Sequence, residues 1–543
     1  MKPGIERIAI PVLTVLLLAL FLLRGQQESG QKGIAVCMDV QILSSEQFDT
    51  CAAELEEKAA VPGTILFNGC AAPFDEEKSL LYLPAGRDAE GCFHASGRLE
   101  PASPGDHLYF LEDACFDDPG RAVAEGHAFD WILVSGSSFC RGQAVLTGLP
   151  VLSLDWDRDL EIQGKKSYIG RFTVCMPESA GTVSDRCSFH VRGNTSTFYE
   201  KKSYRISLQD RNGDKKKENL LGIRDDDDWI LLPMLTDTSR IREKTAYDLW
   251  NRMQAPAGAD GVVSSSVHYT ELLINNQYFG IYGLMTPVDG KLLGLTERDL
   301  LYKINTWEVP SDEEYRAFDS MEEVCKPNGI SYVDLKYPAR ALAADGWEPM
   351  RLFQGYVYGA MSPEELEAAG VVIDRESILR YNLFCTLTHA MDNTWKNTFL
   401  VCRKQADGSY RLYRDIWDLN YTFGDYFAGK IDNFYTAHSA RSATEIVPFK
   451  DTGYDFEVLR ASDPEGVFTD SCRIWKEIRD AGISAESVCA DAESSMAELI
   501  RSGAMDRESQ RWPQPGPSAD LTEFRRWVTD RFSYLDDIYG YTD

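Results

Sequence analysis

A carboxylate and an amide lie five residues apart in the segment HAMDNTWKNTFL, residues 389–400. They are Asp392 and Asn397, between a helix-like segment and a strand-like one. An enzyme that transfers a phosphoryl group needs a carboxylate to orient the attacking hydroxyl and accept its proton, and oxygen ligands for a metal that neutralises the phosphates. Protein kinases place both groups in one loop with this spacing, although their histidine lies one residue closer to the acid than His389 does. The spacing therefore indicates a phosphoryl-transfer loop.

The segment after Asn397 brings a second acid within reach. NTFLVCRK and YRLYRDIWDL are typical of two strands, and the Asp-Gly in the joining QADGS is a strong hairpin signal. Asp418 follows the second strand, so a hairpin would let Asn397 and Asp418 share one metal ion. Magnesium, or manganese in its place, suits such oxygen ligands. Each residue alone is better explained as a turn residue, but the three with the hairpin favour a phosphate and metal site.

A second candidate region is FHVRGNTSTFYEKKSYRISL, residues 189–208. Arg192 and Asn194 lie at a polar turn whose backbone N–H groups and hydroxyls could contact phosphates, and Lys202 could neutralise them. The alternative is an ordinary hairpin with solvated lysines, because neither a G-x-G-x-x-G pattern nor a Walker loop occurs.

The elements around these residues predict an α+β chain. Alternating strand-like segments run from about residue 148 to 290, interrupted by a helix at DTSRIREKTAYDLWNRM that Asp237, Thr238 or Ser239 could cap. A mixed region with loops follows, and from about residue 373 the chain reads as mainly helical. We expect an atypical two-lobed protein-kinase-like fold with a strand-rich N-lobe and a helical C-lobe, preceded by a membrane anchor and a small accessory domain. The expected boundaries are 1–32 for the anchor or signal peptide, 33–147 for the cysteine-rich accessory domain, and 148–543 for the kinase-like domain (N-lobe 148–290, insertion 291–372, C-lobe 373–543).

The composition limits the classes of partner. A formal net charge of −29 over 543 residues repels nucleic acid phosphates, so we expect no nucleic acid partner. Residues 8–23 are apolar throughout and follow Lys2 and Arg7, which favours an uncleaved membrane anchor over a cleaved signal peptide, with the rest of the chain outside the cytoplasm. The 13 cysteines include no C-x-x-C pattern, so structural disulfides or buried free thiols are expected rather than a zinc cluster.

Five segments together resemble one family, the CotH (spore coat protein H) kinases. They are VRGNTSTFYEKKSYRISL, NLLGIRDDDDWILLPMLTDTSRIREKTAYDLW, LLINNQYFGIYGL, HAMDNTWKNTFL and DIWDLNYTFG, within residues 149–543. The resemblance implies a secretory-type kinase that uses ATP and Mg²⁺ (or Mn²⁺) to phosphorylate serine. By motif position it implies Asp392 as catalytic base, Asn397 and Asp418 as metal ligands, and Lys202 as a nucleotide-phosphate contact.

The chain departs from the family pattern at two positions. Asn420 stands where the metal segment often has a second Asp, and Thr286 stands where the hinge often has Glu. We expect an extracytoplasmic kinase, membrane-anchored at a cell surface or spore envelope, that acts on serine-rich coat or surface proteins. A pseudokinase or binding module of a spore coat or envelope is the alternative, and a metal-dependent hydrolase is a third possibility that the lack of a histidine-rich cluster disfavours.

Overall fold

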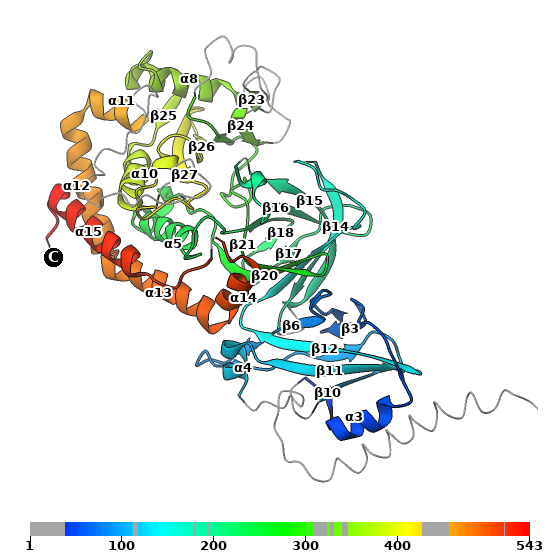
Figure 1. The fold of residues 1–543 in the computed structure, drawn as a ribbon. Coiled ribbons are helices and arrows are strands. Elements are labelled where there is room, and N and C mark those ends of the chain that lie inside the picture. Colours follow the sequence, from blue (N-terminus) through cyan, green and yellow to red (C-terminus); the bar gives the residue numbers. More distant parts are fainter. Residues whose placement is uncertain are drawn as a thin grey trace, which may run out of the picture. The chain divides into compact units, whose positions relative to one another are not determined.

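The computed structural model shows a mixed α/β chain in two compact units (Figure 1). The residues it describes are 38–111, 118–164, 166–177, 181–193, 195–308, 323–325, 331–338, 346–425, 455–514 and 516–542. Neither unit is continuous in the sequence. The first comprises Met1–Pro233, Tyr269–Leu284 and Ala497–Pro517; the second comprises Met234–His268, Met285–Met496 and Ser518–Asp543.

The first unit begins with a mixed sheet in residues 38–147. Its strands, in sheet order, are β1 (Gln41–Leu43), β10 (His107–Leu111), β11 (Ala128–Ser135), β12 (Ser138–Thr147), β6 (Leu80–Pro84) and β5 (Phe74–Asp75), with β2 (Glu56–Glu57) also on β12. A smaller sheet holds β4 (Cys70–Ala71), β3 (Ile65–Phe67) and β9 (Leu99–Pro101), and another pairs β7 (Gly86–Arg87) with β8 (Phe93–His94). Helices α3 (Ser45–Ala52) and α4 (Pro119–Glu125) accompany them.

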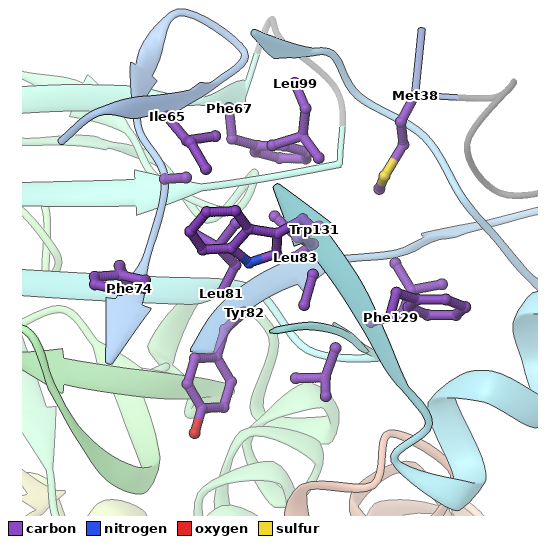
Figure 2. Packing of buried hydrophobic residues seen from close by; sticks show 14 of the residues in the cluster. Met38, Ile65, Phe67, Phe74, Leu81, Tyr82, Leu83, Leu99, Phe129 and Trp131 are labelled. Carbon is purple, nitrogen blue, oxygen red and sulfur yellow. The ribbon is translucent and has the colours of Figure 1, made fainter. Parts of the chain in front are cut away.

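Trp131 of β11 is the centre of the core beneath this sheet. Figure 2 shows it among side chains of β3, β6 and β9. The indole is 1% exposed, and its Nε1 donates to the carbonyl of Gln143 at 2.8 Å. Burying a large aromatic side chain and satisfying its polar atom gives this small sheet its own core.

A closed barrel follows in the same unit. Its strands run in the order β13 (Val151–Asp155), β14 (Tyr168–Cys175), β15 (Val183–Arg192), β16 (Ser203–Gln209), β19 (Asp228–Leu232), β21 (Gln277–Met285) and β20 (His268–Ile274), and β20 closes the barrel by pairing in parallel with β13. The expected strands of this region are confirmed. Inward-facing Leu, Ile, Val and Phe side chains alternate along them and fill the interior.

Helix α14 (Ala504–Arg511) joins the barrel from far along the chain. Its Glu508 forms a 2.6 Å ion pair with Lys201, and both side chains have 0% exposure. Its Arg507 forms a second 2.6 Å ion pair with Glu271 of β20. The helix that the sequence places in the C-lobe region is therefore part of the barrel unit.

The second unit is built on a six-stranded sheet. The strands run in the order β23 (Glu323–Cys325), β24 (Ser331–Tyr337), β22 (Leu300–Ile304), β26 (Thr398–Lys404), β27 (Tyr410–Ile416) and β25 (Val371–Ile373). Its helices are α5 (Arg242–Gln254), α8 (Glu348–Val357), α9 (Pro363–Ala368), α10 (Arg375–Thr388), α11 (Asp455–Ser462), α12 (Pro464–Asp480), α15 (Thr522–Tyr539) and most of α13 (Ala485–Arg501). Helix α10 packs on β27 and on α5 (Figure 1).

Strand β22, within the residues 291–372 that were expected to be an insertion, pairs directly with β26 and is part of the main sheet. One expectation about this unit needs correction. Helix α5 has Ile241 at its N-cap rather than Asp237, Thr238 or Ser239. Asp237 still satisfies the helix start, because its carboxylate accepts from the backbone N–H of Arg242 at 2.8 Å.

Within the described part of the chain, no helix is long and apolar enough to cross a membrane. Residues 8–23, on which the anchor was predicted, lie outside that part. The cysteines whose side chains are described are free thiols, and most of them are buried or half-buried.

Candidate functional site

Asp392 lies in the loop that directly follows helix α10. The helix starts at the N-cap Asp374, whose side chain accepts from the N–H of Ser377 at 2.8 Å, and it ends where His389 takes a left-handed conformation with φ 54°. A short 3-10 turn, Met391–Asn393, follows and carries Asp392. A capped start and a left-handed end fix both limits of the helix, and thereby the position of the turn.

The carboxylate of Asp392 has two partners from its own loop. Its Oδ2 accepts from Nδ2 of Asn397 at 2.9 Å, and its Oδ1 pairs with Nζ of Lys396 at 2.8 Å. The five-residue spacing therefore brings the acid and the amide into direct contact. Because Asn397 uses its amide nitrogen for Asp392, its carbonyl oxygen is the atom that can bind a cation.

The predicted hairpin is confirmed and ends beside this loop. Strands β26 and β27 are antiparallel with Thr398 opposite Ile416, so Asn397 and the residues after Ile416 come to the same end. Asp418 is exposed there. Both Asn397 and Asp418 have left-handed backbones, with φ of 54° and 61°.

Burial and the neighbouring Lys396 have opposite effects on the pKa of Asp392. Partial burial raises the pKa of its carboxyl above the ordinary value, and the negative charge of Asp418 adds to that rise. The ammonium of Lys396 and the hydrogen bonds from Lys396 and Asn397 oppose it. The negative charges of Asp392 and Asp418 repel each other, and a bound cation would relieve that repulsion.

The donor atoms at this hairpin end fit a hard cation. Asp418 offers a carboxylate and Asn397 offers a carbonyl, and magnesium is usually held by one or two carboxylates together with substrate phosphates. In the described stretches, no group of three or more His, Cys, Asp and Glu side chains could hold a metal by itself. The residues therefore fit a metal that arrives with a phosphorylated ligand, and they do not fit a protein-only metal cage.

The segment after Asp418 is held by the region around α5. Nδ2 of Asn420 donates to Oγ1 of Thr236 at 2.9 Å, so the residue that replaces an expected Asp has a structural partner. At the end of the segment, Arg242 forms 2.8 Å ion pairs with both Asp237 and Asp425. Burial raises the pKa of Asp425 to about 7, while Arg242 opposes the rise.

Thr286, the second departure from the expected motif, is also engaged. It is 2% exposed, and its Oγ1 lies 3.1 Å from Oγ of Ser265. Its hydroxyl therefore forms a buried hydrogen bond within the second unit.

The candidate phosphate loop lies in the first unit, between β15 and β16. Arg192 is opposite Ser203 in the strand pair and donates to its Oγ at 3.2 Å. Lys202 donates to the carbonyls of Thr197 at 3.0 Å and Tyr199 at 2.7 Å, so it stabilises the turn that precedes it. Asn194 lies outside the described residues. Phosphate binding by these three residues stays a prediction.

The lysine next to Lys202 has a different environment, which the sequence did not suggest. Lys201 is fully buried, and besides Glu508 it donates to the carbonyl of Ile281 at 2.7 Å. Oε2 of Glu508 accepts from the N–H of Ile281 at 2.7 Å, so the ion pair is also fastened to β21. Lys202 is therefore half-buried and Lys201 is fully buried. Only Lys202 agrees with the alternative of a hairpin with solvated lysines.

The acidic run at residues 225–228 is not an open cation site. Asp226 accepts from the N–H groups of Asp227 and Asp228 and pairs with Arg224. Lys215 lies 2.8 Å from Asp227. The carboxylates of Asp226 and Asp227 therefore have partners within the protein.

Two residues of the catalytic-type loop were missed by the sequence reasoning. Lys396 could have been found, because a lysine four residues after Asp392 is a recognised ion-pair spacing. Asn393 gave no signal, because its side chain binds backbone atoms: Nδ2 donates to the carbonyls of Asn397 and Trp417.

Comparison with known proteins adds one finding to this geometry. No curated protein matches the chain. A family model described as CotH kinase protein matches residues 189–535, which is more than half of the chain and includes Asp392, Asn397 and Asp418. This chain therefore belongs to the CotH kinase family.

Proposed function

We propose that this chain is an atypical protein serine kinase that uses ATP with Mg²⁺ or Mn²⁺. The observation that carries the proposal is the joining of Asp392 to Asn397 by a 2.9 Å hydrogen bond, with Asp418 at the same end of the hairpin. Membership of the CotH kinase family supports it. The proposal includes a two-lobed kinase-like fold, with a strand-rich N-lobe of about residues 148–290 and a helical C-lobe of about residues 373–543.

Each residue of the loop has one role in this proposal. Asp392 orients the substrate hydroxyl and accepts its proton, and Lys396 keeps a positive charge beside that carboxylate. Asn397 and Asp418 hold the metal ion. When bound, the metal supplies neutralisation of the phosphate charge.

The setting of the reaction is part of the proposal. Residues 8–23 form a membrane anchor, because they are apolar and follow Lys2 and Arg7. The rest of the chain then acts outside the cytoplasm, at a cell surface or spore envelope, on serine-rich coat or surface proteins. A mother-cell or forespore compartment would supply the ATP that is scarce outside most cells.

Transfer of labelled γ-phosphate from ATP to a serine-rich acceptor tests the proposal. The full-length chain is assayed with Mg²⁺ or Mn²⁺ beside Asp392→Asn and Asp418→Asn, which keep side-chain size and remove one charge each. Asp480→Asn is the matched control, because Asp480 is exposed on α12 and pairs with Lys476. Transfer that both site variants abolish and the control retains supports the kinase. Equal transfer by all four chains refutes it.

A pseudokinase or binding module is the second candidate. Asn420 favours it, because its amide donates to Thr236 and adds no negative charge to the metal segment. Nucleotide binding without label transfer would select this candidate. A metal-dependent hydrolase is disfavoured, since the described residues contain no group of three or more His, Cys, Asp and Glu side chains that could hold a metal.

A further inference from the structure

Asn393 lies between the Asp392 loop and the end of the hairpin, and it is 1% exposed. Its Nδ2 donates to the carbonyl of Asn397 at 3.1 Å and to the carbonyl of Trp417 at 2.5 Å. Trp417 immediately precedes Asp418. One side-chain amide therefore contacts the main chain at both candidate metal ligands, and we call these two bonds the amide clamp.

The two candidate ligand residues have an uncommon backbone conformation. Asn397 and Asp418 are both left-handed, a conformation that costs most L-residues roughly 1–2 kcal/mol and that Asn and Asp adopt more readily than most. Residues in such conformations persist when their surroundings hold them there. The clamp binds the carbonyl of the first left-handed residue and the carbonyl just before the second.

The clamp itself is anchored to α10. The hydroxyl of Tyr381 donates to the carbonyl of Asn393 at 2.6 Å, and the N–H of Asn393 donates to the carbonyl of Ala390 at 3.0 Å. The side chain can be oriented in only one way, because two carbonyls require the nitrogen and cannot face the amide oxygen. The position therefore demands a side-chain donor of this size.

We infer that Asn393 is the positioning residue that holds the main chain at Asn397 and before Asp418, so that the side-chain carbonyl of Asn397 and the carboxylate of Asp418 can bind one metal ion. This inference rests on the proposed function. Residues that orient metal ligands from behind typically contribute about 10–100-fold in metal affinity. Asn393 touches neither the metal nor the substrate, so its effect is on the placement of the ligands.

The test is Mn²⁺ affinity, measured by electron paramagnetic resonance on the full-length chain in detergent with a non-hydrolysable ATP analogue. Asn393→Asp places a carboxylate against two carbonyls, and Asn393→Ala removes the donor without adding charge. Thr388→Val is the matched control, because it removes a buried hydrogen bond within α10, from Oγ1 to the carbonyl of Phe384. Thermal unfolding of each chain is recorded alongside.

We expect both Asn393 variants to bind Mn²⁺ at least about tenfold more weakly than the wild type, with Thr388→Val within about twofold at a similar melting temperature. Equal affinity of Asn393→Ala and Thr388→Val would overturn the inference. So would a failure of both Asn393 variants to fold, because Asn393 would then be a general stabiliser. A wild-type chain that binds no Mn²⁺ with the nucleotide would instead refute the proposed function from which the inference starts.

Discussion

Breaking the buried ion pair between Lys201 and Glu508 should cost the barrel unit several kcal/mol of stability. Both side chains are fully buried, 2.6 Å apart, and both also bind the backbone of Ile281. Removing one partner of a buried ion pair costs about 3–5 kcal/mol, because the other charge is left without compensation. We therefore expect Lys201→Met to lower the free energy of unfolding of the barrel by that amount at pH 7.

The remaining charge makes a second, sharper expectation possible. Adding Glu508→Gln to Lys201→Met removes the unpaired carboxylate and leaves an amide of the same size, so the double variant should be more stable than Lys201→Met alone, by about 2 kcal/mol.

Hydrogen exchange of peptides from β21 and α14, followed by mass spectrometry, measures the stability of the barrel separately from that of the second unit. Thermal denaturation gives the stability of the whole chain. Lys202→Met is the matched control: it removes the adjacent lysine, which is half-buried and bonds to two carbonyls, and should cost no more than about 1 kcal/mol. Equal effects of the two lysine substitutions, or a double variant less stable than Lys201→Met, would refute the reasoning.

The remaining predictions concern one residue each. Burial raises the pKa of Asp415 to about 8, so the folded state keeps a proton that the unfolded state loses near pH 4. The free energy of unfolding should then fall by a few kcal/mol between about pH 4 and pH 8, and Asp415→Asn should reduce this slope in melting curves. Lys396→Met removes the cation beside Asp392 and should slow phosphate transfer by about one to two powers of ten without lowering the melting temperature appreciably; unchanged transfer would contradict the role given to Lys396. Gly280→Ala should lower the melting temperature, because a Cβ there would clash with Oε2 of Glu508 and φ is 91°. A variant that melts like the wild type would show that β21 can shift.

Local patterns made the hairpin and its loop predictable. Asp407-Gly408 specified the turn between β26 and β27, and strand register then brought Asn397 and the Asp418 end together. Asp392 and Asn397 are only five residues apart, so the conformation of the single turn between them determines whether their side chains can form a hydrogen bond. A contact of this kind depends only on neighbouring residues and can be expected from the sequence.

Contacts across long stretches of sequence were not predictable. Lys201 looked like one of two solvated lysines, because its partner Glu508 lies 307 residues further on and an ordinary helix surface glutamate gives no sign of burial. Strand β22 was missed as a strand of the main sheet, since its neighbour β26 is nearly a hundred residues away and its surroundings read as loops. Asn393 was missed for a different reason: a side chain that binds main-chain carbonyls leaves no pattern of partner residues.

The dependence of the barrel on α14 has a consequence for how the chain folds during synthesis. Strands β13 to β21 are made first, but Glu508, which forms the buried ion pair with Lys201, is made only with residues 497–517. A unit closed by contacts of such long range forms late and slowly, and its unfinished strands stay exposed to aggregation meanwhile. A chain interrupted before residue 508 should therefore lack a stable barrel, even though every barrel strand is present. A chaperone that binds the growing chain would have to protect these strands until α14 has been made.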